Sequence, residues 1–283
     1  MNIAPRFLGR GSWLARRDPR VLVLVIVFFI FATIQIWDLR LIFLLLLVAL
    51  GYYRLAGIPF HAVRKNWILA LTFLTLVVFF NTVLTGNRFP GLEVHPYFTL
   101  PLLGTVISAE TVAYAASQWM RYVAMVAVGF PMAFCVAPAD FGVTFARLGV
   151  PSKFAFGVDL TFRFLPSLAA DYQETIDAQR IRGYEPERRR GGGPIARLRS
   201  MVPVLTPLTV NAIAGAEDTI DAMDLRGFGT GKRTWLRHLQ FDRTDRLVIA
   251  FFAAILVGAT LGGFLTGSSH LWVPPFLIDL ARR

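Results

Sequence analysis

The stretch WILALTFLTLVVFFNTVLT, residues 67–85, contains no charged residue. A helix needs about 20 predominantly apolar residues to cross the hydrocarbon core of a bilayer, and this stretch comes close to that length. Similar apolar stretches lie at residues 21–37, 41–58, 111–136 and 247–266. Lipid offers no partner to unpaired backbone groups, so such segments are expected to be helical. The sequence therefore predicts an all-α, polytopic membrane protein with five spans.

The composition agrees with a membrane protein. Of 283 residues, 55% are hydrophobic and 17% are charged, whereas soluble domains usually carry about 25% charged residues. This excludes a soluble enzyme, a disordered protein and a disulfide-stapled secreted domain. The single cysteine, Cys135, lies in an apolar run and has no partner for an internal disulfide.

The excess of positive charge indicates orientation. The net charge is +11, and basic residues cluster in the leader before the first span, at the end of the second span and between the second and third spans: Arg6, Arg10, Arg16, Arg17, Arg20, Arg54, Arg64 and Lys65. Cytoplasmic flanks of membrane spans are rich in Lys and Arg, and these residues face anionic lipid. We therefore expect a multi-pass protein of the cell inner membrane with a cytoplasmic N-terminus, an outer C-terminus and no nucleic-acid partner.

Three regions are expected along the chain. Residues 1–136 form a transmembrane region, residues 137–243 a cytoplasmic region of long helices that is too charged to cross a bilayer, and residues 244–283 the last span and the tail. Within the cytoplasmic region, Pro166 is expected to kink or break one helix, and Pro203 to begin another. The basic run RRRGGG at residues 188–193 is expected to be a solvated or lipid-facing turn.

One motif occurs twice in the cytoplasmic region, as DAQRIRGY at residues 177–184 and as DAMDLRGF at residues 221–228. The glycine of each copy, Gly183 or Gly227, is a good left-handed helix terminator. Arg182 and Arg226 are expected to be the last helical residues, where a positive charge is stabilising by about 0.3–1 kcal/mol. Each copy therefore predicts a helix that ends in an arginine.

The residues that precede each arginine leave its guanidinium group available to a partner protein. Ala178 and Ala222 lie one turn back and are small enough to admit another surface. No acidic residue stands three or four positions before either arginine, where ion pairs form on a helix, although Glu185 could pair with Arg182 across the turn. A guanidinium binds carboxylates and carbonyls in a fork. A single Arg-Gly pair is explained by an ordinary helix end, but two matched copies favour a paired docking site.

Two units of this kind resemble the transmembrane T component of energy-coupling factor transporters, which import vitamins and metal ions. PAD at residues 138–140, LGVP at 148–151 and RFLP at 163–166 extend the resemblance. It implies coupling helices that dock on two ABC ATPase subunits, and a membrane S component that binds the substrate. The docking residues it implies are Ala178, Arg182, Gly183, Ala222, Arg226 and Gly227.

The resemblance implies that this chain itself performs no chemistry, with no catalytic residue, no metal and no cofactor. The residues themselves also predict that this chain does not bind ATP through a P-loop. Gly231-Lys232-Arg233-Thr234 lacks the first glycine that such a phosphate-binding loop needs. Hydrolysis is therefore expected on a partner.

Two other classes remain open. A membrane-embedded, Mg²⁺-dependent enzyme of the prenyltransferase type would use acidic helix residues as hard oxygen ligands, although a spacing of three residues makes successive side chains drift around a helix. The candidates are Glu217, Asp218, Asp221 and Asp224. A self-contained carrier or channel would use Arg121, which lies within the fourth span. Arg121 would line a pathway in that case, or otherwise snorkel to the outer interface.

Overall fold

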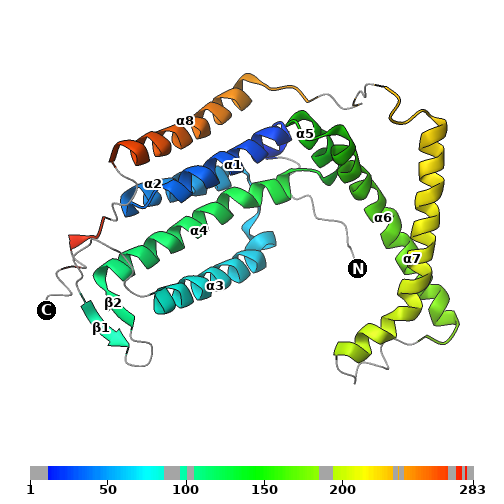
Figure 1. The fold of residues 1–283 in the computed structure, drawn as a ribbon, viewed down its shortest axis with the longest axis horizontal. Coiled ribbons are helices and arrows are strands. Elements are labelled where there is room, and N and C mark those ends of the chain that lie inside the picture. Colours follow the sequence, from blue (N-terminus) through cyan, green and yellow to red (C-terminus); the bar gives the residue numbers. More distant parts are fainter. Residues whose placement is uncertain are drawn as a thin grey trace. The chain divides into compact units, whose positions relative to one another are not determined.

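The structure is a computed structural model that describes residues 12–85, 96–100, 105–184, 194–231 and 239–266, with residues 235, 272–275 and 278 (Figure 1). The chain divides into two compact units. We call Pro138–His238 the long-helix unit, and the remaining described residues the apolar unit. The predictions for Glu185, for the turn at 188–193 and for residues 232–234 fall outside the described residues.

Helices make up almost all of the apolar unit, which confirms the all-α class. A small antiparallel hairpin, β1 (Pro96–Leu100) with β2 (Thr105–Ser108), is the exception, and its register pairs Thr99 with Val106. The helices are η1 (Leu14–Arg16), α1 (Pro19–Gln35), α2 (Leu39–Leu55), α3 (Phe60–Thr85), α4 (Ala109–Cys135) and α8 (Arg243–Thr266).

Polar caps fix where three of these helices begin. The side chains of Asp18, Asp38 and Ser108 accept hydrogen bonds from backbone N–H groups in the first turns of α1, α2 and α4. Such a cap satisfies one of the free donors that every helix start leaves, and its loss costs about 1 kcal/mol. The helix starts are therefore set by short polar residues between apolar runs.

Helix α4 organises the packing of the apolar unit. It contacts α1, α2 and α3, while α1 also contacts α8. Four alanines of α4 are fully buried: Ala109, Ala113, Ala124 and Ala127. Small residues let helix backbones approach closely, which is the usual basis of helix packing in membranes. The Phe252 ring on α8 stands edge-on to Phe29 of α1 and to Tyr52 of α2, at centroid distances of 6.1 and 5.6 Å.

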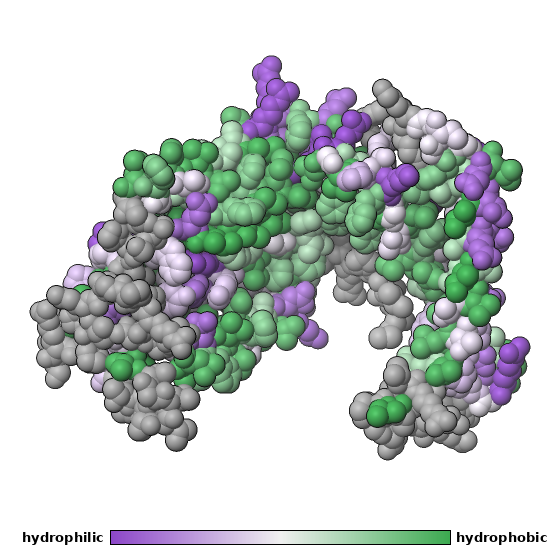
Figure 2. Space-filling view, in the orientation of Figure 1, coloured by the Kyte–Doolittle hydropathy of each residue, from purple (hydrophilic) through white to green (hydrophobic). Residues whose placement is uncertain are grey.

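The outer faces of these helices are hydrophobic. Among the described residues, α3 and α8 are each long and apolar enough to cross a membrane, and α4 qualifies when joined with Pro138–Arg147 as a broken span. Leu69 and Phe264 are 73% and 87% exposed, and Figure 2 shows hydrophobic side chains over most of the visible face of α1, α2 and α8. The five-span count, the orientation and the region boundaries stay predictions.

Arg121 on α4 is buried. One of its terminal nitrogens donates a hydrogen bond to the carbonyl of Ile36, which ends α1, and its guanidinium carbon lies 5.2 Å from the centroid of the Trp37 ring. Arg121 therefore makes a contact that neither expected role included: it holds the end of a neighbouring helix.

Cys135, the last residue of α4, is a free, buried thiol. Its sulfur lies 3.8 Å from the hydroxyl oxygen of Ser12 and 3.9 Å from the carbonyl oxygen of Ala56. The only cysteine of the chain is thus enclosed by the apolar unit.

The long-helix unit contains η2 (Pro138–Asp140), α5 (Phe141–Arg147), α6 (Ser152–Ile181) and α7 (Pro194–Leu225). Helix α5 packs on α6, and α6 contacts α7. A Cβ atom added to Gly142 of α5 would lie 2.5 Å from the Cβ of Asp159 and 2.9 Å from the carbonyl oxygen of Ala155. Glycine is therefore required where α5 meets α6.

The prolines do not divide the long helices as expected. Pro166 lies inside α6, and Pro203 and Pro207 lie inside α7, so neither helix is broken. A proline removes one backbone hydrogen bond and costs about 3 kcal/mol in a helix interior, yet the many remaining turns propagate through it. The cost takes the form of a bend, and the ribbon of α7 changes direction in its first part (Figure 1).

Candidate functional site

The end of α6, which we call the first tip (residues 177–184), closes with a pair of reverse hydrogen bonds. The N–H of Tyr184 donates to the carbonyl of Gln179 at 2.9 Å, and the N–H of Gly183 donates to that of Arg180 at 3.0 Å. Gly183 has φ +85°, in the left-handed region. Together these features form a Schellman motif, which satisfies helix carbonyls that would otherwise lack donors.

The end of α7, the second tip (residues 221–228), repeats this arrangement. The N–H of Phe228 donates to the carbonyl of Met223 at 3.0 Å, the N–H of Gly227 donates to that of Asp224 at 2.9 Å, and Gly227 has φ +68°. The two copies of the sequence motif therefore have the same backbone geometry, as the repeated glycine predicted.

Each arginine stands one position further along than expected. The helices end at Ile181 and Leu225, so Arg182 and Arg226 are the residues between the helix and its glycine. The shift follows from the Schellman motif, which begins its turn one residue before the glycine. Both arginines are exposed, and within the described residues neither side chain makes a hydrogen bond or an ion pair.

The surroundings of the two guanidinium groups are also alike. Ala178 and Ala222, one turn back, are both exposed. The aliphatic residues just before the arginines, Ile181 and Leu225, are 89% and 91% exposed. Water does not favour such exposure of aliphatic side chains. Each tip thus presents an aliphatic side chain and an adjacent cation.

The tips differ in their acidic residues. In the first tip, Asp177 accepts a 3.3 Å bond from the guanidinium of Arg180. In the second tip, Asp224 takes the place of that arginine, next to the exposed carboxylates of Asp218 and Asp221. Among the described residues, no group of three or more His, Cys, Asp or Glu side chains is arranged to hold a metal ion. The second tip is the more acidic of the two.

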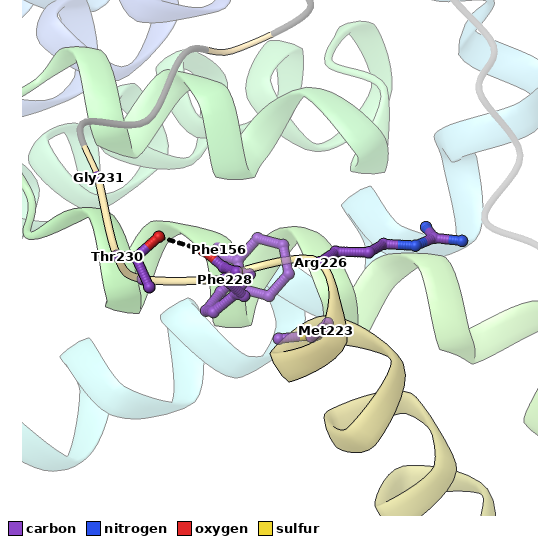
Figure 3. Close-up of a pocket in the computed structure, with 8 residues that line it drawn as sticks. Phe156, Met223, Arg226, Phe228, Thr230 and Gly231 are labelled. Atoms are coloured by element: carbon purple, nitrogen blue, oxygen red, sulfur yellow. Dashed lines mark hydrogen bonds between the residues drawn. The ribbon is translucent and has the colours of Figure 1, made fainter.

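A hollow of about 450 Å³ adjoins the second tip. It is lined by Phe156, Met223 and Arg226–Gly231, with the hydroxyl of Thr230 donating to the carbonyl of Gly227 at 2.8 Å. The rings of Phe156 on α6 and Phe228 lie 4.7 Å apart at 53°. Figure 3 shows the two rings together above Met223, with Arg226 extending away from them. Sequence reasoning missed Phe156, which is one phenylalanine among 25 and far from the motif.

A set of apolar helices and two long helices with matched cationic ends define a helical membrane protein. Residues 10–235 match the family described as CbiQ, cobalt transport protein. The match covers most of the chain, and the chain belongs to this family. It is a multi-pass membrane protein of a transport family.

Curated relatives carry the name energy-coupling factor transporter transmembrane protein EcfT. The protein from Staphylococcus aureus is 25% identical, over 90% of this chain and 94% of that protein. The protein from Listeria innocua is 26% identical, over 89% and 95% of the two chains. The protein from Exiguobacterium sibiricum is 35% identical over 125 residues, 42% of this chain and 46% of that protein. The resemblance to the T component is therefore confirmed.

Proposed function

We propose that this chain is the transmembrane coupling subunit, or T component, of an energy-coupling factor ABC importer. It transmits the ATP-driven motion of two ATPase subunits to a membrane S component that binds the vitamin or metal ion. ATP is hydrolysed on the ATPases, and the S component selects the substrate. The observation that carries the proposal is the pair of helix ends with the same backbone hydrogen bonds, each with an exposed arginine.

Each tip docks on one ATPase. The guanidinium of Arg182 or Arg226 forks onto a carboxylate or onto backbone carbonyls of the ATPase. Ile181 and Leu225 enter an apolar groove beside that acceptor, which removes their exposed surface from water. The small Ala178 and Ala222 let the groove wall approach, and Gly183 and Gly227 set the direction in which the chain leaves.

The long helices carry the motion. Helix α6 has 30 residues and spans about 45 Å at 1.5 Å per residue, and its packing on α7 couples the two tips. Exposed apolar residues along α7 offer a face on which an S component packs: Val210, Ile213 and Ile220. When the ATPases bind ATP and close, they move the tips. Helices α6 and α7 pass this displacement to the S component.

The proposal fixes an orientation. The tips must face the cytoplasm, where ATP is available, in the inner membrane of the cell. The same side carries the N-terminus and the basic residues Arg54, Arg64 and Lys65, which face anionic lipid.

The test is co-purification of the affinity-tagged chain from membranes, with mass spectrometry of the bound subunits, for the parent, Arg182→Ala, Arg226→Ala and the double variant. We expect the parent to retain ATPases, each single variant to retain less, and the double variant to retain none and to lose ATP-dependent uptake while still inserting normally. Arg180→Ala is the matched control, because Arg180 lies at the same helix end but is paired with Asp177. Recovery of the parent without any ATPase, or a double variant that keeps both, would refute the proposal.

A further inference from the structure

The second tip is held by a contact from outside its own helix. Phe228 follows the terminating glycine of α7, and its ring lies 4.7 Å from the ring of Phe156, which is in the second turn of α6. Aromatic pairs at this separation are stabilising beyond the apolar area they bury. The contact therefore ties the turn that follows Arg226 to the opposite helix.

The turn itself is closed by short-range bonds. Thr230 donates twice to the carbonyl of Gly227, from its hydroxyl at 2.8 Å and from its backbone N–H at 3.3 Å, and Gly229 has φ +92°. These bonds make residues 227–230 a compact unit, so the position of the Phe228 ring determines the position of the whole turn. The contact between the Phe228 and Phe156 rings joins this compact turn to α6.

The direction of Arg226 follows from that anchor. Figure 3 shows the side chain of Arg226 leaving the backbone on the side opposite to the two rings. Phe228 is half-buried, while Arg226 is exposed. With one face of the turn fixed against α6, the other face, which carries the guanidinium, is turned outward.

We propose that Phe156 is a positioning residue for the second tip, which it fixes through Phe228 so that Arg226 is presented outward to its ATPase. The last part rests on the proposed function. The placement of the turn by Phe156 is independent of the proposed function. The first tip lies at the other end of α6 and serves as an internal reference.

The first experiment measures hydrogen exchange of the parent and of Phe156→Ala in detergent or nanodiscs. Loss of the ring contact should speed exchange at the amides of Gly227 and Phe228 by roughly 2- to 10-fold, with no change at Gly183 and Tyr184. Phe156→Tyr keeps the ring and should restore protection, and Phe228→Ala should reproduce the effect from the other side. Unchanged exchange at the second tip, or an equal rise at both tips, overturns the proposal.

The second experiment is a double-mutant comparison of ATPase retention. Combining Phe156→Ala with Arg226→Ala should retain no less ATPase than Arg226→Ala alone, because both act at one tip. Combining it with Arg182→Ala should retain less than Arg182→Ala alone, because both tips are then affected. Equal losses in the two combinations indicate general destabilisation and overturn the proposal. If Arg226→Ala itself keeps its ATPase, the proposed function fails, and the exchange measurement alone decides whether Phe156 positions the turn.

Discussion

Arg121 of α4 donates a hydrogen bond to the backbone carbonyl of Ile36, the residue that ends α1. The last carbonyls of a helix lack intrahelical donors and carry partial negative charge. In a lipid-facing bundle, water does not supply the missing donors, so a buried arginine from a neighbouring helix takes that place. The same contact brings the guanidinium over the ring of Trp37.

Arg121→Met should therefore destabilise the apolar unit. It leaves the Ile36 carbonyl without its donor, which costs about 1–3 kcal/mol for a buried acceptor. The measurement is thermal unfolding of the purified protein in detergent, with Arg121→Lys expected to lie between the parent and the methionine variant. A methionine variant as stable as the parent would mean that relief of the buried charge offsets the lost bond.

Gly142→Ala should destabilise the long-helix unit, because the new methyl group would lie 2.5 Å from the Cβ of Asp159. Overpacking of this kind typically costs about 1–3 kcal/mol. Gly157→Ala is the matched control in the same unit: nothing lies within 4 Å of its added Cβ, and alanine in a helix interior should stabilise by about 0.5–1 kcal/mol. Limited proteolysis and thermal unfolding measure the stability of both variants. Equal stability of Gly142→Ala and Gly157→Ala would contradict the packing argument.

Gly183→Ala should loosen the first tip through the backbone alone. Gly183 has φ +85°, and an added Cβ meets nothing within 4 Å, so the expected cost of roughly 1–2 kcal/mol comes from the left-handed conformation. Gly183→Asn should be milder, because asparagine visits this conformation more readily. Exchange of the Tyr184 amide should be slowest in the parent, faster in the asparagine variant and fastest in the alanine variant. ATPase retention should fall in the same order. A reversed order of the two variants would contradict this.

The start of α8 should respond to pH. The pKa of Asp242 is lowered by the bond its carboxylate accepts from the backbone N–H of Arg243, and next by the guanidinium of Arg17. A lowered pKa means that the ionised form stabilises the fold above the ordinary carboxyl pKa, and that this contribution is lost as pH falls through the lowered value.

The corresponding measurement is the difference in melting temperature between the parent and Asp242→Asn. The difference should be largest near neutral pH and shrink as pH falls below about 3.9. A difference that stays constant over the same range would show that the ionised carboxylate is not what matters at this position.

The sequence predicted what depends on local chemistry. The apolar stretches correctly predicted helices. The two Arg-Gly copies correctly predicted two helix ends, each with a glycine at positive φ. It failed where tertiary packing decides. Pro203 was expected to begin a helix but lies inside α7, and Pro166 does not break α6, because a single lost hydrogen bond does not end a helix of 30 residues. The β1–β2 hairpin lies between two expected spans, in a segment for which the sequence predicted no strand.

The candidate site divides in the same way. Arg182 and Arg226 were found because the motif repeats, but their place one residue beyond the helix follows from a hydrogen-bond pattern that residue spacing does not reveal. Phe156 was missed because its partner is distant in the chain. The contact of Arg121 was not foreseen because its acceptor is a backbone carbonyl, which has no signature in the sequence. Contacts between segments that are distant in the chain cannot be read from a single sequence.

The enclosed Cys135 has a practical consequence for following the tips at work. Because the chain has no second cysteine and this thiol is shielded from reagents, a cysteine introduced beside Arg182 or Arg226 becomes the preferred target for a spin label or fluorophore. Displacement of either helix end during a transport cycle can then be recorded by spectroscopy, without first engineering a cysteine-free background.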